Sequence, residues 1–274
     1  MARSLSIPLV LAGALAALGA GPYRVQTANF VVEAASPQVA QEVAQYAEVY
    51  RKEKAIQWLG REMPTWPTPL PVRVTVQMDG AGGATTFVYG PSGVERQDMH
   101  IEGRYDRLLA SVLPHEITHT VFAHYYRCPV PRWADEGGSV LSEDEPERNR
   151  HDQIARGILN TPGRLIPLRR LFSLKEYPND VMSLYAEGYS VSNFLVGAKG
   201  RQTFLSFVAA GMRNNDWDGA VQSHYGYRDV NDLERAWADS LRKPRPTQLV
   251  KNSEPGETAT APRGRLPAPA RPLR

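Results

Sequence analysis

The sequence predicts an α+β fold, in which a small N-terminal mixed sheet packs on a central helix and is followed by a mainly helical lobe. Apolar residues recur in short strand-like segments up to residue 102, whereas from residue 103 they follow helical spacing almost to residue 242. The 274 residues are 42% hydrophobic and 22% charged. This composition is typical of a globular protein and excludes collagen-like, mucin-like and wholly disordered chains.

Four segments have the short apolar or alternating pattern that is typical of strands: 29–33, 71–78, 85–89 and 96–101. The last two are separated by Gly90-Pro91-Ser92-Gly93, which favours a hairpin. The segment 79–83 reads Asp-Gly-Ala-Gly-Gly, and we expect a flexible turn there.

One helix is expected between the first two of these strands. Ser36 is a good N-cap, and Pro37 suits the first helical position because proline needs no hydrogen-bond acceptor there. Apolar residues from Val39 to Tyr50 then recur at helical spacing, and Gly60 is a typical C-terminal stop.

The first twenty residues have the composition of an export signal. A positive charge at Arg3 precedes an apolar stretch, and Gly19-Ala20-Gly21 offers small residues for cleavage. The apolar stretch has about twelve residues, whereas a membrane-spanning helix needs about 20. Residues 1–20 therefore predict a signal peptide and a periplasmic or extracellular protein without a stable membrane span.

The last residues, 243–274, form a predicted disordered tail that is basic and rich in proline. They hold seven Lys or Arg, two Glu and seven Pro, and few large apolar side chains. The tail carries the positive charge of the chain, so the predicted domain 21–242 is mildly acidic. We expect this domain to have a sheet part, 21–102, and a helical part, 103–242. Because the domain is mildly acidic, no nucleic-acid partner is expected. The tail can contact anionic surfaces, although its composition favours a solvated extension.

Residues 113–119 read Leu-Pro-His-Glu-Ile-Thr-His and place the pattern His-Glu-x-x-His in an apolar helical run. Residues four apart lie on one face of a helix, so His115 and His119 can hold one metal ion, and neutral imidazoles suit zinc. Glu116 lies on the adjacent edge and can reach a water without being a ligand. Pro114 crowds the preceding turn, so we expect a kink or a helix that restarts there.

A catalytic zinc site has three protein ligands and one open position. A third histidine six residues after the second is excluded, because that position is Tyr125. The next helix offers a carboxylate, since residues 131–139 read Pro-Arg-Trp-Ala-Asp-Glu-Gly-Gly-Ser. Sixteen residues separate His119 from Glu136, enough for a helix end, a turn and an antiparallel helix. We expect Glu136 to be the third ligand and Asp135 a local brace.

Together these segments resemble the gluzincin zinc metallopeptidases, the thermolysin and aminopeptidase N superfamily with a peptidase MA-like domain. The Trp-x-Asp-Glu-Gly at 133–137 is similar to the Trp-x-Asn-Glu-Gly of the aminopeptidases. The segment 184–190 resembles their Tyr-x-x-Gly helix, whose transition-state tyrosine maps onto Tyr185. The resemblance covers about 103–242 and implies a gluzincin-like fold, in which the small sheet packs on the active-site helix.

Three features depart from the family pattern. The spacing between the second histidine and the glutamate is 16 residues, where the aminopeptidases have 18. The Gly-x-Met-Glu-Asn segment that holds a substrate's amino terminus is absent, because 93–99 reads Gly-Val-Glu-Arg-Gln-Asp-Met, which argues against a dedicated aminopeptidase. The thermolysin pattern has an aspartate where this chain has Val140, so the residue that braces a histidine stays unassigned.

The sequence therefore predicts an exported zinc metallopeptidase that hydrolyses bonds in a peptide or protein substrate. One Zn²⁺ held by the three ligands activates a water, Glu116 acts as general base, and Tyr185 stabilises the oxyanion. We expect an extended peptide to bind along the edge of the strand 96–101. The alternative is a non-catalytic zinc-binding module of the same fold that acts in envelope interactions, and a third interpretation makes the tail the functional part.

Overall fold

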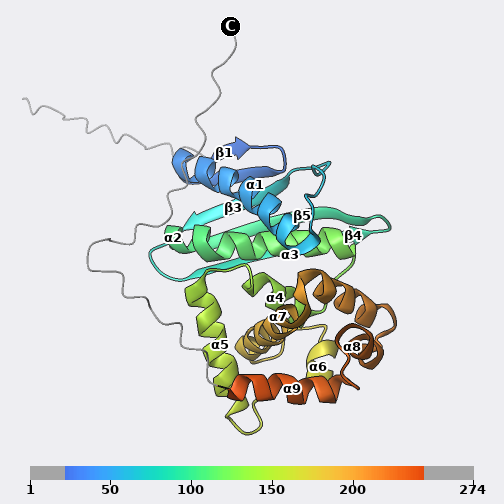
Figure 1. Ribbon diagram of the computed structural model, residues 1–274. Helices are drawn as coiled ribbons and strands as arrows, with labels where there is room; N and C mark the ends of the chain where they lie inside the picture. The colour runs from blue at the N-terminus through green and yellow to red at the C-terminus, as the bar shows by residue number, and fades with distance from the viewer. Residues whose placement is uncertain (1–21, 244–274) are drawn as a thin grey trace, which may run out of the picture. The chain divides into compact units, whose positions relative to one another are not determined.

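The computed structural model describes residues 22–243. The predicted signal segment 1–20 and, apart from Lys243, the predicted tail 243–274 lie outside the described residues. The described part of the chain is an α+β fold in which a small mixed sheet is followed by helices (Figure 1). The predicted fold class is confirmed at this level.

The sheet has five strands in the order β1-β2-β3-β5-β4. Their bounds are β1 Tyr23–Gln26, β2 Phe30–Ala34, β3 Leu70–Val76, β4 Ala81–Gly90 and β5 Gly93–Gly103. Strands β2, β3 and β5 are parallel neighbours, whereas β1 pairs with β2 and β4 pairs with β5 in antiparallel fashion. The sheet is mixed because β2 and β3 are joined through a helix, whereas a tight turn joins β4 to β5.

Three features of the sheet differ from expectation. The segment 79–83 is only partly a turn, because β4 begins at Ala81 and pairs with Gly103; glycines lack side chains but keep the backbone groups that form the ladder. Strand β1 was not expected from its short sequence. The segment 96–101 lies within β5, between β3 and β4, so neither edge is free and the prediction that it binds a peptide is wrong.

Helix α1 spans Pro37–Leu59 and has the predicted ends. Pro37 is in its first turn, and Gly60 adopts the left-handed conformation at φ 72°, where its N–H donates to the Ile56 carbonyl at 3.0 Å. Glycine adopts this conformation without strain. One side of α1 packs into the core beside the sheet through Ala40, Val43, Ala44 and Ala47.

All later elements among the described residues are helical. They are α2 Tyr105–Arg107, a π-helical turn Leu108–Val112, α3 Leu113–Tyr126, α4 Arg132–Val140, α5 Glu145–Leu159, α6 Leu168–Ser173, α7 Val181–Asn214, α8 Trp217–Tyr225 and α9 Val230–Arg242. Within residues 22–243, no helix has the length and apolar character needed to cross a bilayer. The widened π-turn ends just before Pro114, so the predicted disruption there is confirmed.

Helix α3 belongs to two hydrophobic cores. Leu113 and Ile117, in its first half, pack with the sheet and α1, whereas Val121 and Phe122, in its second half, pack with the helices that follow. Figure 1 shows α3 between the sheet and the helices α4 to α9. Helix α3, which is buried from Leu113 to Ala123, therefore lies at the boundary between the two parts of the fold.

Helices α4 and α7 approach closely through two glycines. A Cβ added at Gly137 would meet the backbone of Gly188, and one added at Gly188 would meet the backbone of Trp133. The Trp133 side chain is fully buried and stacks on Phe172 with ring centroids 4.4 Å apart. This packing fixes the position of α4, and therefore of Glu136 next to Gly137.

Candidate metal centre

Two imidazoles from α3 share one side of the helix. His115 and His119 are one turn apart, their ring centroids are 4.8 Å apart, and each residue is only 8% exposed. Glu116 is buried beside them and is 4% exposed. The helical spacing that the sequence shows at 115–119 thus places both rings together.

Helix α4 brings a carboxylate to these rings. Glu136 Oε2 lies 3.3 Å from His115 Nε2 and 3.6 Å from His119 Nε2. These ligand atoms all lie within 4.8 Å of one another. Tetrahedral zinc with bonds of about 2.0–2.2 Å separates its ligand atoms by about 3.3–3.6 Å. Both distances from the Glu136 carboxylate oxygen to the imidazole nitrogens therefore match an edge of a zinc tetrahedron.

The carboxylate of Glu136 also carries an unused acceptor. Its Oε2 is buried and accepts no hydrogen bond among the described residues. An unpaired buried carboxylate oxygen is costly in a protein interior unless a cation faces it. The residues present therefore fit a divalent metal ion, and two imidazoles with one carboxylate are a donor set that suits zinc.

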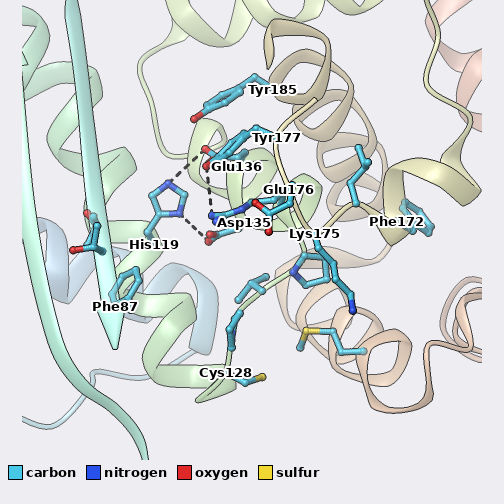
Figure 2. A pocket seen from close by; sticks show the side chains of 18 of the residues that line it. Phe87, His119, Cys128, Asp135, Glu136, Phe172, Lys175, Glu176, Tyr177 and Tyr185 are labelled. Carbon is cyan, nitrogen blue, oxygen red and sulfur yellow. Dashed lines mark hydrogen bonds and ion pairs between the residues drawn. The ribbon is translucent and has the colours of Figure 1, made fainter. Parts of the chain in front are cut away.

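Each of the three candidate ligands is braced from behind. Glu143 Oε1 lies 2.6 Å from His115 Nδ1, and Asp135 Oδ1 lies 2.8 Å from His119 Nδ1. Hydrogen bonds at Nδ1 leave Nε2 of each ring free to bind a metal. The hydroxyl of Tyr177 donates to Glu136 Oε1. Figure 2 shows His119 between Asp135 and Glu136, with Tyr177 beside Glu136.

These contacts identify the residues that brace the two histidines, which the sequence leaves unassigned because position 140 is a valine. Asp135 acts as the local brace that its position in the sequence predicts, and it orients His119. The brace for His115 is Glu143, which follows the end of α4 and also accepts a hydrogen bond from Ser111 at 2.9 Å. No aspartate at position 140 is needed.

Burial and charge act in opposite directions on the pKa values of this cluster. Burial lowers the pKa of His115, but its contacts with Glu136 and Glu143 outweigh this effect and raise that pKa to about 9. The pKa of His119 is likewise raised, because Asp135 and Glu136 outweigh burial. Burial raises the pKa of Glu136, yet the two imidazoles hold it well below its usual range. When no metal is bound, protons on the imidazoles of His115 and His119 supply the positive charge that a metal ion would supply.

Glu116 is oriented from the sheet. The hydroxyl of Thr85, on β4, donates to Glu116 Oε2 at 2.6 Å. Two residues earlier, Gly83 leaves room for this side chain, because a Cβ at Gly83 would lie 2.7 Å from Glu116 Oε1 and 2.9 Å from the Val112 side chain. Strand β4 therefore lies close over the start of α3.

Tyr185 lies beside the same cluster, on α7. Its ring is stacked at 6.3 Å from the ring of His115 and at 6.4 Å from that of Tyr177. Figure 2 shows Tyr185 beside Tyr177. Burial and the charge of Glu136 raise the pKa of Tyr185, so it stays a hydrogen-bond donor near neutral pH. Tyr189, one turn later, is buried against His151 instead.

Two cavities open on either side of Glu116 and Tyr185. The larger, of about 790 Å³, extends towards apolar side chains such as Phe87, Leu174 and Trp217. The smaller, of about 690 Å³, extends towards Arg107 and other charged residues. Both are lined by the first residues of β4, whose outer edge pairs with no other strand among the described residues. The free edge beside the cluster belongs to β4 and not to the segment 96–101, which lies within β5.

Three residues of the centre were not expected from the sequence: Thr85, Glu143 and Tyr177. Thr85 and Glu143 are far from the histidine motif in sequence, and no spacing rule connects them with it. Tyr177 lies in the irregular connection between α6 and α7, where no periodicity predicts the direction of a side chain.

Comparison of the chain with protein-family models, with curated proteins and with solved structures finds no match.

Proposed function

We propose that this protein is an exported zinc-dependent metallopeptidase of the gluzincin type. The observation that carries the proposal is the position of Glu136 Oε2, which is buried, accepts no hydrogen bond among the described residues and lies 3.3–3.6 Å from two imidazole nitrogens. The general base that such an enzyme needs, Glu116, is present and oriented by Thr85. Export is supported by the signal-like composition of residues 1–20.

His115, His119 and Glu136 would hold the ion. A bound zinc ion supplies a Lewis acid that polarises a carbonyl group and lowers the pKa of a water. Asp135, Glu143 and Tyr177 keep the three ligands oriented, which holds this charge in one place relative to the substrate.

In this proposal Glu116 carries out the proton transfers, and a tyrosine stabilises the oxyanion. Glu116 takes a proton from the attacking water and passes it to the leaving amine. Because Thr85 donates to Oε2, the other oxygen of Glu116 remains for this proton. Tyr185 donates a hydrogen bond to the tetrahedral oxyanion, and one such donor is worth roughly 3–4 kcal/mol.

The free edge of β4 supports an extended substrate. A peptide that pairs with this edge lies along Gly83, Thr85 and Phe87 and passes over Glu116 into the two cavities. The absence of the aminopeptidase amine anchor from 93–99 makes internal cleavage the activity to test first.

The experiment is hydrolysis of casein or a quenched peptide by the purified full chain, with its metal content measured. We expect a zinc ion at this centre and turnover that a chelator abolishes and zinc restores. Glu116→Gln should retain zinc and lose activity by about 10²–10⁴-fold, since it removes the general base. The control Glu53→Gln, at an exposed position on α1, should behave like the wild type.

The competing function is a zinc-binding module without turnover, acting in the cell envelope. Bound zinc with no hydrolysis in either the wild type or Glu116→Gln would favour it. Absence of metal from the purified protein, and failure to load zinc, would overturn both functions.

A further inference from the structure

We propose that Glu143, Glu147 and His151 form a second metal site, which binds a first-row divalent ion such as Zn²⁺ or Mn²⁺ beside the first centre. One ligand atom from each residue lies within 4.8 Å of the other two. The three residues succeed one another at intervals of four, and Glu147 and His151 occupy one face of α5. We call them the second cluster. The proposal goes beyond the peptidase function.

The imidazole of the second cluster is buried and unsatisfied. His151 is only 5% exposed, and its Nδ1 accepts or donates no hydrogen bond among the described residues. Its neighbours on the other side are the rings of Tyr185 and Tyr189, at 6.3 and 6.1 Å. A buried ring nitrogen without a partner is costly, and two carboxylates within reach of the ring provide the remaining donors of a metal site.

The carboxylates of Glu143 and Glu147 both have lone pairs left that can bind an ion. Glu143 accepts from Ser111 and faces His115 with its other oxygen, and each carboxylate oxygen has a second lone pair. Glu147 contacts Arg107 and Arg150 at 3.3 Å. The shorter contact of Arg107, at 2.5 Å, is with Asp144, so Glu147 can turn towards an ion while Arg107 stays paired.

The donor set selects the kind of cation. One imidazole and two carboxylates suit a first-row divalent ion, because imidazole suits Zn²⁺ and carboxylates suit Mn²⁺, whereas Ca²⁺ prefers oxygen donors alone. The second cluster lines the smaller cavity together with Glu116 and His115, so an ion can enter from the same opening. Glu143 links the two sites, because it also braces His115.

The test counts ions by elemental analysis after equilibrium dialysis of the full chain against Zn²⁺ or Mn²⁺. We expect two per chain for the wild type, and one for Glu147→Gln, for His151→Gln and for His119→Gln. The control His100→Gln removes a part-exposed histidine on β5 and should retain two. Two ions in both variants of the second cluster would overturn the inference, and Glu147→Gln keeps the test valid if His151→Gln does not fold.

The outcomes separate this inference from the proposed function. One ion in the wild type and none in His119→Gln would overturn the second site and leave the first intact. One ion that His119→Gln retains and Glu147→Gln loses would support the second site and overturn the first. In a parallel dialysis against Ca²⁺, a bound Ca²⁺ ion that Glu147→Gln loses, with no Zn²⁺ or Mn²⁺ bound at the second cluster, would overturn the assignment of the donor set.

Discussion

The proposed catalytic role of Glu116 depends on a residue from a different element of the fold. Thr85 reaches Glu116 from β4 with a 2.6 Å hydrogen bond, so the direction of the carboxylate is set by the sheet as well as by α3. Hydrogen bonds to charged groups are worth about 1.5–3 kcal/mol. Thr85 is therefore a positioning residue for the proposed reaction.

Replacing Thr85 with valine should lower kcat roughly 10- to 100-fold with little change in KM, because the carboxylate loses its orientation while the cavities keep their shape. Steady-state hydrolysis of a quenched peptide measures both constants. Thr85→Ser keeps a hydroxyl and should recover most of the rate. Equal rates in the valine variant and the wild type would remove Thr85 from the mechanism.

Glu187 is a buried carboxyl outside the centre. Burial, opposed only in part by the hydrogen bond from the Ile166 N–H, raises its pKa to about 8 from a usual 4.5. Between pH 4.5 and pH 8 the folded protein therefore holds a proton on Glu187 that the unfolded chain has released. The contribution of this proton to the free energy of unfolding is complete below pH 4.5 and is lost as the pH rises through 8.

Replacing Glu187 with glutamine should remove this pH dependence. Relative to the wild type, Glu187→Gln should gain stability between pH 5 and pH 9, by at most about 1.4 kcal/mol per pH unit. Urea unfolding at several pH values measures the difference. A free-energy difference between the two proteins that stays constant over this range would contradict the raised pKa.

Among the secondary-structure elements, strand β4 lies closest over Glu116 at the start of α3. Its first residues pass over Glu116 and pair with the end of β5, and glycine at position 83 permits the close approach. The neighbouring Gly82 has nothing within 4 Å of a hypothetical Cβ. The two glycines thus offer a matched pair for testing the contact between strand and helix.

Gly83→Ala should reduce peptidase activity at least tenfold, because the new methyl group displaces Glu116 or moves β4 away from it. Gly82→Ala should leave activity unchanged. Activity assays with thermal unfolding of both variants make the comparison. Similar activity in the two variants would show that the strand moves aside without affecting the base.

For the molecule as a whole, the candidate metal centre joins the two parts of the fold. The histidines lie on α3, Glu136 and its neighbour Asp135 lie on α4, and the other two braces come from residues that follow α4 and α6. An ion bound here should stabilise the folded chain, because the unfolded chain does not hold these residues together.

Zinc should raise the Tm of the metal-free protein. At 100 times its Kd, a ligand adds about 2.7 kcal/mol to the free energy of unfolding, which corresponds to a rise in Tm of roughly 5–11 °C for a domain of this size.

The zinc affinity should also rise with pH up to about 9, since zinc must displace the proton that His115 binds with a pKa of about 9. Calorimetry at several pH values measures the zinc affinity, and thermal scans measure the rise in Tm. The variant His119→Gln should lose the part of both effects that comes from zinc bound by His115, His119 and Glu136.

The local features of this protein can be predicted from its amino-acid sequence. Pro37 and Gly60 predict both ends of α1, short apolar or alternating segments predict four of the five strands of the sheet, and the spacing of His115 and His119 predicts a shared helical face. These predictions succeed because caps, strand alternation and helical spacing act over a few residues. The position of Glu136 beside the rings was predicted with the help of its Trp-x-Asp-Glu-Gly context.

Only the tertiary structure decided which distant residues meet. Pairing of β5 with both neighbours left β4 as the free edge, and packing of α4 on α7 through Gly137 and Gly188 carried Glu136 to the histidines. Thr85, Glu143 and Tyr177 reach the centre from three separate segments. Such contacts depend on strand order and helix packing, which are properties of the whole chain and have no signature in a short stretch of sequence.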